Sequence, residues 1–227
     1  GASEYSEIKE SEYNSILNHK ALSKNYSSFL ASEEELPDFL KIYFTRLIRI
    51  EKVREIMALK GFTRASFPDP ENDNFASVVN LAGKDTGWLP AVRTSGEGIF
   101  LELNKEEIKN WLSNFDSKAI SNIYDNEYRK HVENKGWEYR QNRDLVYVLL
   151  HSLSHALIRE LSLRSGYSTT ELQERIYYSE NMCGLLIYTA SGDSEGTLGG
   201  LEEMGKISNF QDVLLNSLKN ALVCSAD

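Results

Sequence analysis

The chain has 227 residues, which is long enough for one large or two small domains with a proper hydrophobic core. Its composition, 41% hydrophobic and 26% charged, is ordinary for a globular protein. The net charge of −9 argues against a nucleic-acid-binding surface over the whole chain, although a local basic patch remains compatible with it. No apolar run approaches the ~18 residues of a membrane span, and no secretory signal is visible. Two cysteines, Cys183 and Cys224, lack CxxC spacing and fit a reducing cytoplasm better than a disulfide framework.

The first 60 residues are predicted to be mainly helical. Residues 4–31 indicate one helix and a loop, with His19 at a solvated position. Residues 36–59 predict a long helix, because Pro37 follows an acidic run and apolar side chains recur along the segment. Basic residues on this helix could contact phosphates, but ion pairs with neighbouring glutamates are the favoured interpretation. Gly61 is expected to end the helix.

The middle of the chain predicts two strands followed by two helices. Residues 88–94 and 98–103 indicate strands joined by a turn at residues 95–97. Asn104 is a capping residue for an amphipathic helix. A second helix is expected over residues 117–134, with a break after it at a glycine.

The stretch from residue 145 to residue 200 organises the rest of the sequence. Apolar residues at helical spacing predict a helix that begins at Leu145 and stops at Gly166. A capping signal at residues 168–171 predicts a short helix up to about Tyr177. The apolar run 183–189 predicts a strand covered on both faces.

The chain is predicted to end in one more amphipathic helix, capped by Ser208. The order of these elements predicts an α/β or α+β fold, helix-rich, in which a mixed sheet of few strands packs against several helices.

His151 and His155 are the first candidates for chemistry. They are four residues apart, so both lie on one face of their helix, as in the HxxxH motif of zinc enzymes. Ser152 stands where that motif carries its catalytic glutamate, so the protease motif itself is absent. The pair could therefore serve a buried polar network, contact a ligand, act in catalysis, or bind a metal with a third ligand from elsewhere. The candidates for that third ligand are Glu160, Cys183, Asp193 and Glu195.

The glycine-rich loop 192–200 carries two carboxylates and is not a phosphate-binding loop, because it lacks the GK[ST] ending. Its acidic residues, Asp193 and Glu195, could bind a metal or accept hydrogen bonds from arginines. One hypothesis gathers Arg64, Glu97, the histidines and Glu195 into a polar pocket resembling a phosphodiesterase site. The catalytic candidates are thus His151, His155 and Glu195. The binding-pocket candidates are Arg64, Glu97, Arg159, Arg175, Tyr188 and Asp193. Cys183 is interpreted as a packed thiol rather than a nucleophile.

Long motifs in the chain resemble a known family. They are HSLSHALIRELSLRSGYSTTELQERIY (151–177), LLIYTASGDSEGTLGGL (185–201), KGFTR (60–64), WLPAV (88–92) and GEGIFLEL (96–103). Over roughly residues 45–224, the sequence is similar to the C-terminal domain of DrmB-like proteins, components of the bacterial anti-phage system DISARM. A more divergent, cysteine-rich form of the same domain is appended to helicases of the MrfA type.

This resemblance implies a domain organisation. Residues 36–227 would form the DrmB-type C-terminal domain, and residues 1–35 a helical lead-in whose first three residues (1–3) look like a cloning scar. Cys224 and Asp227 match the beginning of the family's C-terminal cysteine cluster, and the rest of that pattern is absent. The chain is therefore expected to be a fragment with no cofactor of its own, Cys224 being the first ligand of a zinc cluster completed in the full-length protein.

The resemblance also implies a function. The chain would be a non-catalytic accessory domain of a cytoplasmic defence complex, binding a DrmA-like helicase and assisting DNA binding or sensing. The alternative is a metal-dependent phosphodiesterase or nuclease that uses the His151/His155 helix and the Asp193–Glu195 loop.

Overall fold

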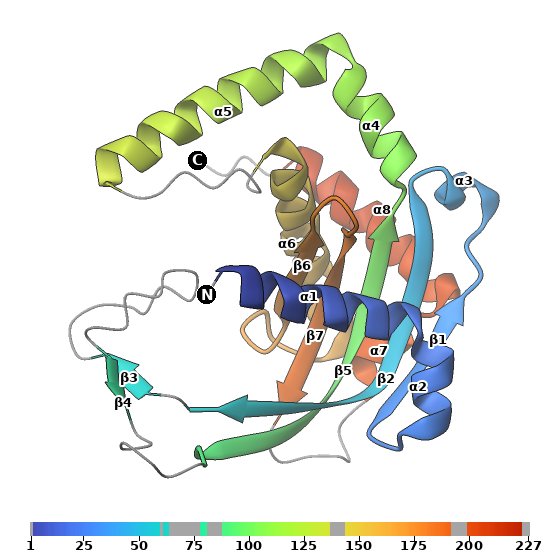
Figure 1. Ribbon diagram of the computed structural model, residues 1–227. Coiled ribbons are helices and arrows are strands. Elements are labelled where there is room, and N and C mark those ends of the chain that lie inside the picture. Colours follow the sequence, from blue (N-terminus) through green and yellow to red (C-terminus); the bar gives the residue numbers. More distant parts are fainter. Residues whose placement is uncertain are drawn as a thin grey trace.

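A five-stranded antiparallel sheet forms the centre of the molecule (Figure 1). The computed structural model describes residues 2–59, 61–63, 78–80, 88–136, 144–191 and 199–223. The strands, in their order across the sheet, are β1 (Phe29–Glu34), β2 (Phe44–Ala58), β5 (Ala91–Leu103), β7 (Cys183–Ser191) and β6 (Gln173–Tyr178). Two short strands, β3 (Gly61–Thr63) and β4 (Val78–Asn80), pair separately. The predicted class, a helix-rich fold with a sheet of few strands, is confirmed, and each pairing of the central sheet is antiparallel.

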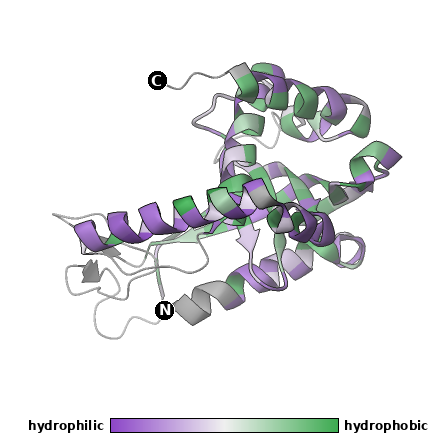
Figure 2. Cartoon of the chain, turned by 90° about the horizontal axis from the view of Figure 1, so that it is seen from above, coloured by the Kyte–Doolittle hydropathy of each residue, from purple (hydrophilic) through white to green (hydrophobic). Residues whose placement is uncertain are grey.

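Helices cover both faces of this sheet, so alternate residues of its central strands enter two different cores. Ile99 and Leu101 of β5 pack on the side of α6 (Leu145–Ser165), α7 (Gly200–Met204) and α8 (Ile207–Val223). Phe100, between them, packs on the opposite side with Tyr13 of α1 (Ala2–Leu17). Figure 2 shows these layers from above, with the N-terminal helix on one side of the sheet and the helices near the C-terminus on the other.

Helix ends follow the local signals in the sequence. Asn104 caps α4 (Lys105–Ser113) by accepting hydrogen bonds from two backbone N–H groups of its first turn. The next helix, α5 (Phe115–Lys135), ends at Gly136, and α6 ends at Gly166. Both glycines have positive φ values, 66° and 83°, which a glycine adopts without steric cost. The predictions for these helices are confirmed.

The long helix predicted over residues 36–59 is wrong. Only the short α3 (Asp38–Lys41) is helical there, and β2 follows it. β2 pairs with β1 on one side and β5 on the other, so its backbone hydrogen bonds go to residues far away in sequence. β-branched residues such as Ile48 and Ile50 suit this pleated, buried environment. Accordingly Gly61 ends no helix and instead begins β3.

Two further expectations are corrected in the same way. The two strands predicted at residues 88–94 and 98–103 are one strand, β5, and Glu97 in the expected turn pairs with Thr189 of β7. The capping signal at Ser168 does form, since Glu171 accepts the Ser168 N–H at 2.8 Å, but it closes an isolated turn. The strand β6 follows that turn because pairing with β7 outweighs the local helical signal.

The N-terminal residues are integrated with the sheet. The segment 1–35 is helical in α1 and α2 (His19–Asn25), and its last residues form the edge strand β1. His19 is 1% exposed, so the prediction of a solvated histidine is wrong. Helix α2 contacts β1, where the Ala31 N–H donates to Ser23 Oγ at 3.0 Å, and His19 Nδ1 lies 3.2 Å from the carbonyl oxygen of Ile16. Within the part of the chain that the structure describes, no helix has both the length and the apolar character needed to cross a membrane.

Candidate functional site

The two histidines lie on a half-exposed stripe of α6 that faces the edge strand β6. Their side chains are 45% and 53% exposed, and their rings meet edge to face with centroids 4.4 Å apart. Glu174 of β6 approaches both: its Oε1 is 2.6 Å from His151 Nδ1 and 3.8 Å from His155 Nε2. Glu174 was not among the candidates predicted from the sequence, because the capping signal at residues 168–171 predicts a helix there. The alternation of β6 is what directs Glu174 towards α6 and its neighbour Arg175 towards α1.

Ser154 holds the other oxygen of the Glu174 carboxylate. This serine is fully buried, and its Oγ donates to Glu174 Oε2. With Oε2 occupied, Oε1 faces the histidines. His151 Nδ1 is buried and has no hydrogen-bond partner among the described residues, because the short contact with Oε1 does not lie along the direction of an N–H···O bond. Two imidazoles and a carboxylate are the ligand set that zinc accepts in several catalytic sites.

A pocket of about 550 Å³ adjoins this cluster, between α6 and α8. His151, His155 and Arg159 line it from one face of α6, at successive four-residue steps. Ser217 and Asn220 line it from α8. Four of the residues singled out from the sequence therefore meet in one place, since Glu160, a candidate third metal ligand, also lines the pocket and accepts a hydrogen bond from Arg164 at 2.6 Å.

Glu97 has a different role from the predicted pocket acid. Its side chain is fully buried in β5. The carboxylate accepts backbone N–H groups at the start of α7, from Gly199 at 2.9 Å, Leu201 at 3.2 Å and Glu202 at 2.9 Å. It also accepts the hydroxyl of Tyr167 at 2.6 Å. Burial, together with this hydrogen bond, raises the pKa of Tyr167, so the hydroxyl keeps the proton that it donates.

Two glycines at the start of α7 are sterically constrained. Gly199 has a φ of 126°, and a Cβ atom on Gly200 would overlap the carbonyl oxygen of Ser165 at the end of α6. The backbone at the start of α7 therefore lies directly against both α6 and the Glu97 carboxylate.

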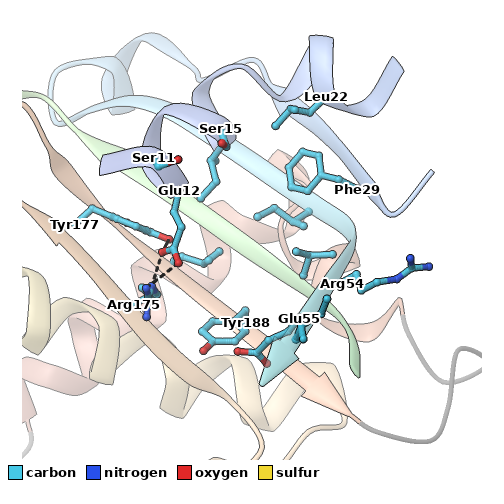
Figure 3. A pocket seen from close by; sticks show the side chains of 15 residues that line it. Ser11, Glu12, Ser15, Leu22, Phe29, Arg54, Glu55, Arg175, Tyr177 and Tyr188 are labelled. Carbon is cyan, nitrogen blue, oxygen red and sulfur yellow. Dashed lines mark hydrogen bonds and ion pairs between the residues drawn. The ribbon is translucent and has the colours of Figure 1, made fainter. Parts of the chain in front are cut away.

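Arg175 and Tyr188 lie on the opposite side of the sheet, in a pocket of about 490 Å³ beneath α1 (Figure 3). Arg175 makes two bonds to Glu12 of α1, at 2.6 and 2.8 Å, the paired geometry that suits guanidinium and carboxylate. Tyr188 donates to Gln173 at 2.9 Å. Figure 3 shows the Arg175–Glu12 pair at one end of the pocket and Arg54 at the other.

The candidate residues predicted from the sequence therefore lie in three separate parts of the structure. His151, His155 and Arg159 come together on the α6 side, Glu97 binds α7, and Arg175 and Tyr188 lie on the α1 side. Arg64, Asp193, Glu195 and Cys224 lie outside the described residues.

A third pocket, of about 660 Å³, is an apolar groove between α3, α4, α6 and α8. We call it the α8 groove. Its apolar lining includes Phe39, Tyr43, Trp111, Leu149, Leu215 and Leu218, and its acidic residues are Glu107 and Asp212. Leu215 and Leu218 are 50% and 47% exposed, although both are large and apolar. Periodicity in the sequence predicted the α8 helix but not this groove, because the groove needs helices from four separate parts of the chain.

The C-terminal third of the chain is similar to a zinc-binding domain family. Residues 153–226 match the model of the MrfA Zn-binding domain, a range that includes His155, Glu174 and Cys224. Over nearly its whole length the chain is similar to the DISARM protein DrmB of Bacillus paralicheniformis, with 41% identity over 226 residues. That alignment covers 99% of this chain and 40% of the relative, so the chain spans about two fifths of that protein. The resemblance to DrmB-like proteins predicted from the sequence is confirmed.

The buried carboxylate of Glu97 gives a prediction about stability. We expect Glu97→Gln to lower the free energy of unfolding by about 3 kcal/mol, because an amide accepts these buried N–H donors less well than a carboxylate. Tyr167→Phe removes one of the four bonds and should cost about 1 kcal/mol. Urea unfolding followed by circular dichroism measures both. Glu106→Gln, on the exposed face of α4, is the control, and equal stability of Glu97→Gln and wild type would contradict this role.

The buried thiol of Cys183 gives a prediction about reactivity. Burial raises its pKa to about 11, and the thiolate is the reactive form. In a Cys224→Ser background we therefore expect little alkylation by iodoacetamide at pH 8 in the folded protein, and complete alkylation in urea. Intact-mass spectrometry measures the modified fraction. Rapid modification of the folded protein would indicate a nucleophilic rather than a packed cysteine.

Proposed function

We propose that this chain is a non-catalytic accessory domain of a bacterial anti-phage defence complex in the cytoplasm. It would bind a DrmA-like helicase and assist DNA binding or sensing. The observation that carries the proposal is the 41% identity to the DISARM protein DrmB along 99% of the chain. Because the chain spans about two fifths of that relative, it would contribute one part of the whole protein's role.

The α8 groove supports the helicase-binding part of the proposal. An exposed apolar groove of this size is a frequent docking site for a partner helix, which buries its own apolar stripe there. Glu107 and Asp212 contribute negative charge beside the apolar lining. The occupant we propose is an amphipathic segment of the helicase with apolar side chains facing the groove and basic side chains at its flank.

The outer ends of β2 and β5 support the DNA-binding part. They form a two-stranded ribbon that extends past the helices (Figure 1). Arg54 and Arg93 are exposed on this ribbon, and Arg93 lies opposite Ile56 in the pairing. A two-stranded ribbon fits the major groove of DNA, and exposed arginines bind phosphates. This local basic feature is compatible with the acidic charge of the chain as a whole.

A metal-dependent phosphodiesterase or nuclease is the second candidate function, favoured by the cluster of His151, His155 and Glu174. Zinc, when bound to three such ligands, leaves one position for water, and it lowers the pKa of that water. Arg159 in the adjoining pocket could bind a substrate phosphate. Asp193 and Glu195, which the sequence predicts as further residues of this site, lie outside the described residues.

The DNA part is tested by fluorescence anisotropy of labelled single- and double-stranded DNA, across a salt series, with and without divalent metal. We expect binding with a clear salt slope, and Arg54→Glu combined with Arg93→Glu should reduce that slope by about 2. Lys118→Glu combined with Lys219→Glu, two exposed residues of α5 and α8, is the charge-matched control. Equal salt slopes for the ribbon variant and the control would exclude the ribbon as the DNA contact.

The same samples, run on a denaturing gel, separate the two candidate functions. Intact DNA supports the accessory domain. Metal-dependent cleavage that disappears in His155→Ala would contradict the accessory domain and support the phosphodiesterase or nuclease.

The helicase part is tested by biolayer interferometry with a purified DrmA-like helicase. Leu215→Lys and Leu218→Lys should each weaken binding at least tenfold, because each places a charge in the groove that the partner's apolar face would occupy. Leu163→Lys is the control, since Leu163 is a 79% exposed leucine of α6 outside the groove. If all three variants bind like wild type, the α8 groove is not the helicase-binding surface.

A further inference from the structure

We infer that His151, His155 and Glu174 bind one divalent transition-metal ion of the zinc type, which joins helix α6 to the edge strand β6. This site is distinct from the cysteine cluster expected to begin at Cys224. It also goes beyond the proposed function, because a metal that joins two elements of the fold requires neither DNA binding nor catalysis.

The geometry of the three side chains fits such an ion. One nitrogen of each histidine and one oxygen of Glu174 all lie within 4.8 Å of one another. Zinc–nitrogen and zinc–oxygen bonds of about 2.0–2.1 Å place tetrahedral ligands about 3.3 Å apart. The two separations from Glu174 Oε1, 2.6 Å and 3.8 Å, lie on either side of that value. Small rotations of exposed side chains are therefore enough to bring all three atoms to one ion.

The hydrogen bonds around the cluster favour an ion over a simple ion pair. If Glu174 and His151 were only partners of each other, Nδ1 would be expected to point its N–H at the carboxylate. Instead Nδ1 has no aligned partner among the described residues, although Oε1 lies 2.6 Å away. Two ligand atoms that are close but do not hydrogen-bond to one another can both turn towards an ion, once their separation opens from 2.6 Å to about 3.3 Å. Ser154 meanwhile occupies Oε2 and so orients the carboxylate, as residues behind metal ligands commonly do.

The ligands are carried by elements whose relative position is already held near the site. His151 and His155 share one face of a 21-residue helix, so the spacing of their backbones does not vary. Asp144 caps that helix and also accepts the hydroxyl of Tyr178, the last residue of β6, at 2.6 Å. An ion at Glu174 would reinforce the Ser154–Glu174 hydrogen bond, the contact between α6 and β6 that lies four residues earlier in the strand than Tyr178. Because β6 is an edge strand, this connection would strengthen the side of the sheet with the fewest strand partners.

Three protein ligands leave one position of a tetrahedral ion open. The half-exposed rings and the 550 Å³ pocket leave room for water or an anionic oxygen at that position. Arg159, which lines the same pocket, is on the helix face that carries both histidines.

The test uses the chain without an affinity tag, in a Cys224→Ser background that removes the expected cysteine ligand, after extraction with a chelator. Calorimetric titration with Zn²⁺ should give one equivalent per chain. Titration with Co²⁺ should give visible absorption bands of an ion held by nitrogen and oxygen ligands. His155→Ala and Glu174→Gln should each weaken zinc binding at least 100-fold, and Ser154→Ala about 10- to 100-fold, as expected for a residue that orients a ligand.

Matched controls separate ligand loss from a general effect of the substitutions. His131→Ala on α5 and Glu180→Gln in the turn after β6 replace exposed residues of the same types and should leave binding unchanged. Circular dichroism checks that each variant is folded, and zinc should raise the melting temperature of wild type but not of Glu174→Gln.

Failure to bind an equivalent of zinc, or equal binding by His155→Ala, Glu174→Gln and wild type, would overturn the inference. The cluster would then be a polar contact between α6 and β6. That result is separate from failure of the accessory-domain proposal, which the helicase titration and the metal-free arm of the DNA titration measure.

Discussion

The buried carboxylate of Glu97 positions the start of α7 against strand β5. Glu97 lies in β5, and its oxygens accept three backbone N–H groups of the α7 start together with the Tyr167 hydroxyl. A fully buried carboxylate is very costly without such donors, so the start of α7 cannot move away from β5 without leaving a charge unsatisfied. Because α8 follows α7 directly, this constraint also positions the helix that lines the α8 groove and the pocket beside the histidines.

The Arg49 guanidinium also attaches the helices on this side to the sheet. Arg49 of β2 binds both Glu34 of β1 and Glu202 of α7, and Glu34 also accepts the N–H of Ile207 at the start of α8. The helices of the α6 side are thus attached to the sheet through polar contacts at their N-terminal ends and through apolar packing along their length. This rigid layer carries the histidine cluster and the α8 groove, whereas the proposed DNA-binding ribbon extends beyond it. The proposed roles therefore occupy separate surfaces and can be altered one at a time.

The candidate metal site depends on the register of one edge strand. Glu174 faces the histidines on α6, and the adjacent Arg175 faces Glu12 on α1. A shift of one residue in β6 would exchange the two side chains and put a cation beside the histidines. The Glu174–His151 and Arg175–Glu12 contacts thus depend on one register, seen from opposite faces of the sheet. Tyr177, two residues after Arg175, is buried against Phe100 and Tyr13.

The sequence by itself determined the helices α4, α5 and α6, the buried strand β7, and the resemblance to DrmB-like proteins. Caps such as Asn104 and stops such as Gly166 act within one helical turn, so they can be recognised in a short window of sequence. It also placed His151 and His155 on one helix face. Only the tertiary structure decided that β2 and β6 are strands, that Glu97 supports α7, and that Glu174 completes the histidine cluster. Strand hydrogen bonds join distant residues, as Ile48 with Phe100, so their partners exist only once the chain has folded.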